Sequence, residues 1–238
     1  MVNTVTQIKT NPLTQLYRKL VKPKWIMLDG MRVVTDPAVV TKGIRRGLYR
    51  GNYEFGERAL ARMALKPTDR VLEIGAGVGV VSLVCSSICG EKSVLSYEIN
   101  PLAVQGLRAN FKLNHMNPNI RQRAVAAEKG QHSFYFNKNI FSSSLLARNN
   151  TREELVECDA LGDVLAEFQP NVLVMDVEGA EETLLPLIKQ SPIKSIIVEM
   201  HPHIIGQEAV NHLIEGLGAA HFVLFASDGA NVYWFGRD

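Results

Sequence analysis

Acidic side chains follow three apolar runs of this sequence, each with the length and composition of a buried strand. The groups at these positions are Glu98, then Asp176 with Glu178, then Glu199 followed by His201 and His203. Because ligands of an open α/β sheet bind outside the carboxyl ends of its strands, we expect these side chains to meet around one pocket. Carboxylates there would accept hydrogen bonds or protons, and the ordinary pKa of His201 suits proton transfer near neutral pH.

A glycine-rich stretch is expected to face these acids. Residues 71–74 form a short apolar run that leads into Gly75-Ala76-Gly77-Val78-Gly79, and a helical pattern follows. This order predicts a buried strand, a tight turn and the start of a helix. Glycines let the backbone approach a ligand closely, and a helix N-terminus offers unpaired N–H groups. The stretch therefore predicts a nucleotide-type site at the end of the first sheet strand.

The spacing of the glycines favours one class of nucleotide. A dinucleotide-binding turn carries its third glycine at the sixth position, which is Val80 here, whereas Gly79 comes one residue early. NAD is therefore disfavoured. Glu73 before the turn and Glu98 at the end of the next strand resemble the acids of class I S-adenosylmethionine-dependent methyltransferases. A carboxylate at Glu98 can accept hydrogen bonds from both ribose hydroxyl groups.

The most specific feature is Asp176-Val177-Glu178-Gly179-Ala180-Glu181, which stands between a strand and a helix. It resembles the FkbM family of S-adenosylmethionine-dependent methyltransferases, as do Tyr53-Glu54 and residues 197–201. The resemblance covers residues 44–205. The cofactor contacts that these resemblances imply involve Tyr53, Glu73, Gly75, Ala76, Gly77, Glu98, Ile99, Asn100, Ala126 and Asp176.

The FkbM resemblance implies methyl transfer to a hydroxyl group of a sugar, a polyketide or another small molecule. An aliphatic hydroxyl has a pKa of roughly 16, so attack on a sulfonium methyl group needs a base or a metal to remove the proton. Asp176 would meet either the methionine amine or the acceptor, and Glu178 and His201 are the other candidates for the base. Contacts with the acceptor are expected from Glu54, Glu199 and His203.

Simpler roles stay open for several of these residues. Glu178 and Glu181 would also stabilise a helix N-terminus through its dipole, and this is the role expected of Glu181. His201 and His203 flank a proline and suit an ordinary loop. Asp176, Glu178 and Glu199 offer oxygen ligands for a divalent metal, but no metal is assigned, because carboxylates at strand ends are common without one.

The composition is that of an ordinary globular protein, with 46% hydrophobic and 21% charged residues in a chain of 238. A net charge of +2 gives no large basic surface, so no nucleic-acid partner is expected. No membrane span or signal peptide is expected. Three cysteines without metal-type spacing favour a reducing, cytoplasmic setting. Trp25 and Trp234, on two predicted hairpins, would suit a contact in a homo-oligomer.

The elements that must position these groups alternate between strand and helix from residue 71 onward. This alternation predicts a Rossmann-like, doubly wound and mostly parallel α/β sheet. Strands are expected at 71–74, 94–98, 120–126, 172–176 and 195–199, and an antiparallel hairpin at 221–235 closes the sheet. An inserted hairpin is expected at 132–136 and 142–146.

Residues 1–65 are predicted to form an N-terminal extension that covers the pocket of a methyltransferase domain at 66–238. A short helix is expected near residues 13–20 and a hairpin at Asp29-Gly30. A second helix is expected to open at Asp36-Pro37, and a third to occupy residues 54–65.

Other functions stay open. An N-methyltransferase acting on protein or nucleic acid would be expected to carry an Asn/Asp-Pro-Pro-aromatic loop after the fourth strand, where this chain has Asp176-Val177-Glu178-Gly179. A non-catalytic subunit that binds S-adenosylmethionine is the second alternative. An oxidoreductase is the third, and the early third glycine disfavours it. No motif identifies the acceptor.

Overall fold

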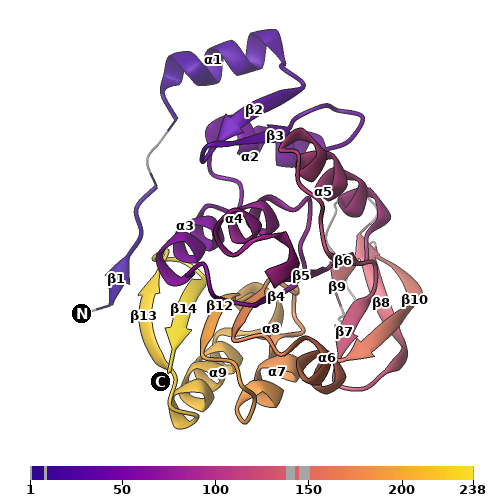
Figure 1. The fold of residues 1–238 in the computed structure, drawn as a ribbon, viewed down its shortest axis with the longest axis vertical. Coiled ribbons are helices and arrows are strands. Elements are labelled where there is room, and N and C mark those ends of the chain that lie inside the picture. The colour runs from indigo at the N-terminus through magenta and orange to yellow at the C-terminus, as the bar shows by residue number, and fades with distance from the viewer. Residues whose placement is uncertain (1, 8–9, 138–142, 145–150, 238) are drawn as a thin grey trace.

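The computed structural model describes residues 2–7, 10–137, 143–144 and 151–237, and an eight-stranded sheet forms its centre (Figure 1). In spatial order the strands are β1 (Asn3–Thr4), β13 (Val223–Ser227), β14 (Val232–Gly236), β12 (Ser195–Glu199), β11 (Val172–Met175), β4 (Val71–Ile74), β5 (Val94–Tyr97) and β6 (Ile120–Arg121). β14 runs antiparallel to both of its neighbours, and the other pairs are parallel. The predicted α/β fold with its closing antiparallel hairpin is confirmed.

Every residue of β4, β5 and β11 is buried, which shows that the central strands are covered on both faces. Val71 and Leu72 illustrate the alternation, since successive side chains enter different cores on opposite faces of the sheet. Helices of both layers are visible in Figure 1. One core includes α2 (Lys42–Arg50), α3 (Phe55–Ala64), α4 (Val80–Cys89) and α5 (Pro101–Leu113), and the other α6 (Leu161–Phe168), α7 (Glu181–Leu184) and α9 (Gln207–Ala219). Every helix in the described ranges is too short or too polar to cross a bilayer.

The order of the strands reverses beside β4. From β4 the chain continues outward to β5 and β6, and it then returns to β11 and β12 on the other side. The loops that follow β4 and β11 therefore diverge at the carboxyl ends of these strands. That divergence creates the crevice in which open α/β sheets bind ligands.

A second sheet replaces part of the predicted third strand and the predicted insertion. The stretch 120–126 divides into β6 in the main sheet and β7 (Ala124–Ala126), which pairs with β10 (Thr151–Ala160). β8 (Gly130–Asn137) pairs with β10 over most of its length, and with β9 (Ser143–Ser144) at one end. The expected pairing is therefore confirmed at residues 143–144, whereas the longer pairing with β10 was not predicted. Residues 142 and 145–146 lie outside the described residues.

The N-terminal elements largely follow the predictions. α1 (Pro12–Val21) and α3 are present, and β2 (Trp25–Leu28) and β3 (Met31–Val34) form the hairpin. Asp29 and Gly30 have φ angles of 52° and 82°, the left-handed pair that a two-residue turn requires. The pairing of β1 with β13 was not expected.

Two predicted helices have different bounds. α2 begins at Lys42, because Thr41 caps it, whereas Asp36 accepts the N–H of Ala38 in a local turn. The helix that the sequence predicts at residues 181–189 is α-helical only to Leu184 and continues as η2 (Leu185–Ile188), which contains Pro186. η1 (Glu91–Ser93) and α8 (Pro202–Ile205) are further short elements.

Candidate functional site

A cavity of about 900 Å³ opens at the carboxyl ends of β4, β5, β11 and β12. This volume is within the range of pockets that bury small ligands. The site residues predicted from the sequence that line it are Tyr53, Glu54, Gly75, Gly77, Glu98, Ile99, Asp176, Glu178 and Glu199. The sheet crevice therefore brings together the glycine turn and most of the acids at the strand ends.

The glycine turn forms the floor of the cavity beside β4. The N–H groups of Gly75 and Ala76 both donate to the carbonyl oxygen of Tyr97, at 3.0 Å, which fixes the turn against β5. Gly75 has a φ angle of 86°, and a Cβ atom there would lie 1.7 Å from the carbonyl oxygen of Asp176. Glycine is required here because the two loops touch at this point.

Glu98 forms the wall above the turn. Its Oε2 atom accepts the N–H of Gly77 at 2.8 Å, and its Oε1 atom accepts the N–H of Asn100 at 2.7 Å. Burial raises the pKa of this carboxyl group to about 7, although these backbone hydrogen bonds oppose the shift. The lone pairs that remain on the two oxygens can accept hydrogen bonds from a ligand in the cavity.

The opposite wall is acidic. Glu54 and Glu57 come from the start of α3, and Asp176, Glu178 and Glu199 come from the ends of β11 and β12. Burial, followed by the nearby charge of Glu57, raises the pKa of Glu54 and of Asp176 well above their ordinary values. Burial and the charge of Asp176 raise the pKa of Glu199 to about 9. A wall of five carboxyl groups, of which Glu57 is buried and the others partly buried, favours a ligand that carries positive charge.

Tyr53 closes the same end of the cavity. Burial raises the pKa of its hydroxyl group, and a hydrogen bond with Glu54 adds to the shift. Its hydroxyl oxygen would lie 3.6 Å from a Cβ atom at Gly77. Tyr53 and Glu54 therefore stand directly over the glycine turn.

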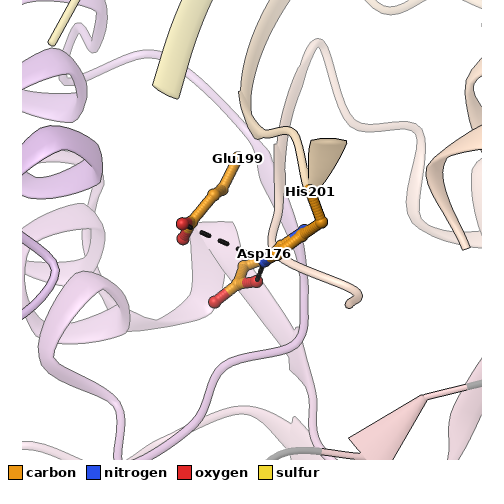
Figure 2. Close-up of side chains that lie close together, drawn as sticks. All are labelled: Asp176, Glu199 and His201. Carbon is orange, nitrogen blue, oxygen red and sulfur yellow. Dashed lines mark ion pairs between the residues drawn. The ribbon is translucent and has the colours of Figure 1, made fainter. Parts of the chain in front are cut away.

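His201 and Glu181 form a buried pair behind the acidic wall. The two side chains are 5% and 0% exposed, and Nδ1 of His201 contacts Oε1 of Glu181. Nε2 of His201 lies 3.5 Å from Oδ1 of Asp176 and 3.9 Å from Oε1 of Glu199 (Figure 2). Burial alone would lower the pKa of His201, but the hydrogen bond and charge of Glu181 raise it above its ordinary value.

Several residues predicted to contact the cofactor lie outside the lining of the cavity. Glu73 lies in the interior, where its carboxylate accepts hydrogen bonds from Ser82 and Ser96, so it supports the turn from beneath. Asn100 caps α5 through the N–H of Leu102. These residues do not line the cavity, and the same is true of Ala76, Ala126, His201 and His203.

Sequence reasoning missed two acids of the site. Glu57 is buried in the first turn of α3, where its spacing of three from Glu54 indicates a shared helix face. Glu181 was expected only to serve the N-terminus of α7, but it also holds His201. No local pattern links Glu181 to His201, which lies 20 positions further along the chain.

Comparison with known proteins identifies the class of the domain. Residues 46–153 match the family model described as the TRM5/TYW2 methyltransferase domain. Ribosomal protein L11 methyltransferase of Thermus thermophilus is 29% identical over 105 residues, which is 43% of this chain and 39% of that protein. The same enzyme of Prochlorococcus marinus strain AS9601 is 28% identical over 155 residues, 64% of this chain and 46% of that protein.

Solved structures support the fold. The crystal structure of methyltransferase FkbM from Methylobacillus flagellatus superposes with a TM-score of 0.50 at 11% identity, over 84% of this chain and 56% of that one. A tRNA (uracil-54, C5)-methyltransferase of Pyrococcus abyssi gives 0.50 at 11% identity, over 90% and 44%. The chain spans less than half the length of the curated relatives it matches.

The family match and the fold agree on one class of enzyme. Membership of the FkbM family is not confirmed, because the matching family model is a different one. Both nevertheless describe methyl transfer, and the glycine turn with Glu98 is the cofactor pattern expected of that class. This chain contains an S-adenosylmethionine-dependent methyltransferase domain of the class I fold.

Proposed function

We propose that the protein transfers the methyl group of S-adenosylmethionine to a hydroxyl group of a small molecule. The observation that carries this proposal is the carboxylate wall, where Asp176, Glu178 and Glu199 share one cavity with the glycine turn. The FkbM resemblance around Asp176 supports the same class of acceptor.

The residues beside β4 and β5 fit the cofactor. Gly75 exposes backbone where a side chain would collide with the loop after β11, and Glu98 offers carboxylate oxygens for the ribose hydroxyl groups. Bound S-adenosylmethionine supplies an electrophilic methyl group on a sulfonium. Asp176 and Glu54 are the carboxylates available to its ammonium group.

The carboxylate wall also provides the base. The acceptor oxygen forms its bond to the methyl carbon while the carbon–sulfur bond breaks and its electron pair stays on sulfur. The hydroxyl proton moves to a carboxylate, for which Asp176 is the first candidate and Glu178 the second. Burial raises the pKa of Asp176, and a raised pKa makes a carboxylate a stronger base. His201, 3.5 Å from Asp176, would orient it.

The N-terminal segment 1–65 would close the cavity and help to choose the acceptor. Tyr53, Glu54 and the start of α2 line the cavity opposite the strand ends, so this segment and the domain at 66–238 would share one site.

Three free, buried cysteines support the proposed cytoplasmic setting. Trp25, which is 44% exposed, is a candidate for a contact between subunits.

Methylation of a protein is the second candidate. The matched relatives named ribosomal protein L11 methyltransferase support it, and the acidic wall would suit a cationic acceptor. The loop Asp176-Val177-Glu178-Gly179 supports the hydroxyl acceptor instead, because it lacks the Pro-Pro-aromatic sequence expected for planar amino groups.

Methyl transfer from radiolabelled S-adenosylmethionine tests the proposal. The purified protein is incubated separately with a panel of hydroxylated small molecules, with total cell protein and with total RNA. Label is expected in the small-molecule fraction, and Asp176→Asn should reduce the rate about 100-fold or more, as loss of a general base does. Label in protein or RNA alone would overturn the proposed acceptor class.

A further inference from the structure

Three side chains of different elements meet at the carboxyl ends of β11 and β12. Asp176 directly follows β11, Glu199 is the last residue of β12, and His201 precedes α8. One oxygen or nitrogen atom from each lies within 4.8 Å of the other two. Figure 2 shows the three side chains pointing toward one another.

His201 is fixed in the orientation that this cluster needs. Its Nδ1 atom contacts Glu181, whose side chain is fully buried, so its Nε2 atom faces the two carboxylates. A carboxylate on one ring nitrogen is the usual support for an imidazole that binds a metal through the other. Glu181 therefore acts as a positioning residue for His201.

The cluster also contains a buried atom without a hydrogen-bond partner in the described part of the chain. Oδ1 of Asp176 is buried and has no hydrogen-bond partner among the described residues, although Nε2 of His201 is 3.5 Å away. Nε2 is 3.9 Å from Glu199, which is beyond hydrogen-bonding distance, and the His201 side chain is only 5% exposed. A buried polar atom without a hydrogen bond is costly unless another group satisfies it.

The spacing fits such a group. Nε2 of His201 is 3.5 Å from the Asp176 oxygen and 3.9 Å from the Glu199 oxygen, and the ligand atoms of the three residues all lie within 4.8 Å of one another. An ion placed among them would lie about 2 to 2.5 Å from each ligand atom. We propose that Asp176, Glu199 and His201 form a site for a divalent cation of the Mn²⁺ type. Two carboxylates suit Mg²⁺ and Mn²⁺, whereas the imidazole favours Mn²⁺ over Mg²⁺.

The site would give the proposed function its means of activating the acceptor, and this role rests on that function. The glycine turn and Glu98 lie at β4 and β5, and the cation site lies one strand further along the sheet, at β11 and β12. A cation there would lower the pKa of a bound hydroxyl group and orient its oxygen toward the methyl group. With Asp176 bound to the cation, the hydroxyl proton would pass to Glu178, the other candidate for the base in the cavity. Binding of the cation itself does not depend on the identity of the acceptor.

Electron paramagnetic resonance of Mn²⁺ tests the binding directly. The full-length protein, freed of metal with a chelator, is titrated with MnCl₂, and loss of the free-ion signal is measured. One ion per chain is expected. Asp176→Asn and Glu199→Gln should each weaken binding about tenfold or more, and Glu181→Gln by a similar factor through His201.

Glu54→Gln is the matched control, because it removes a carboxylate from the same cavity but outside the three ligands. Its effect should stay below about threefold, as expected from a change of one nearby charge. Circular dichroism checks that each variant is folded. The inference fails if the folded wild-type protein binds no Mn²⁺ at millimolar concentration, or if its affinity is the same in Asp176→Asn and Glu199→Gln.

The outcomes separate this site from the proposed function. Methyl transfer to a hydroxyl group that persists with a chelator would refute the catalytic role of the cation and leave the function intact. Mn²⁺ binding that depends on Asp176 and Glu199, together with methyl transfer only to protein, would keep the site and refute the acceptor class.

Discussion

The affinity for S-adenosylhomocysteine should depend on the ionisation of Glu98. Ribose hydroxyl groups donate hydrogen bonds to an ionised carboxylate more strongly than to a neutral carboxyl group. Burial raises the pKa of Glu98 to about 7, so in the absence of ligand the group changes charge across the neutral range. Because a raised pKa favours the protonated form below pH 7, we expect binding to tighten as the pH rises.

The size of the effect follows from this pKa. If only the ionised form binds, the dissociation constant at pH 6 exceeds its limiting value about 11-fold, and at pH 8 by only about 10%, so the net change is about tenfold. Glu98→Gln removes both the titration and the charged acceptor. The affinity at pH 8 should then fall about tenfold or more, the value of one charge-assisted hydrogen bond.

Isothermal titration calorimetry at pH 6, 7 and 8 measures both effects. Glu215→Gln is the matched control, since this exposed glutamate of α9 lies outside the cavity and should leave the pH profile unchanged. An affinity that does not vary with pH in the wild-type protein would refute the reasoning. If the affinity of Glu98→Gln varies with pH as strongly as that of the wild-type protein, the titration belongs to another group.

Two further variants test how the turn is held. Gly75→Ala places a Cβ atom 1.7 Å from a carbonyl oxygen at a φ angle of 86°, so urea unfolding should show a loss of about 2 kcal/mol or more, whereas Gly162→Ala, with open space in α6, should be neutral or stabilising. Asn110→Ala removes the buried amide that bonds to the N–H of Val34 and the carbonyl of Val78, each at 2.7 Å, and should cost about 2 to 4 kcal/mol; a loss below 1 kcal/mol would mean that water replaces the side chain.

The part of the fold that was predictable is the part that local chemistry determines. β4, β5 and β11 are mostly apolar runs whose every residue is buried, and Asp29-Gly30 is a sequence typical of the two-residue turn with positive φ at both positions. β10 was missed because its sequence, TREELVECDA, is mostly polar. Its long pairing with β8 stabilises a strand that its own residues do not favour.

The residues of the site likewise divide into those that local sequence predicts and those that it does not. The acids at strand ends converge because parallel strands end at one edge of the sheet, so Glu98, Asp176 and Glu199 were predictable. The inward direction of Glu73 was not predictable, because it depends on two serines from α4 and β5 whose hydroxyl groups donate hydrogen bonds to its buried carboxylate. The contact of His201 with Glu181 likewise depends on how two loops pack, which spacing along the chain does not encode.

A crystal structure of the protein with S-adenosylhomocysteine is the most direct test of the central claim. We expect the ribose hydroxyl groups to contact Glu98, the homocysteine part to lie along Gly75 and Gly77, and the sulfur atom to face Asp176. A ligand bound outside the cavity at the ends of β4 and β11, or no ligand at millimolar concentration, would contradict it.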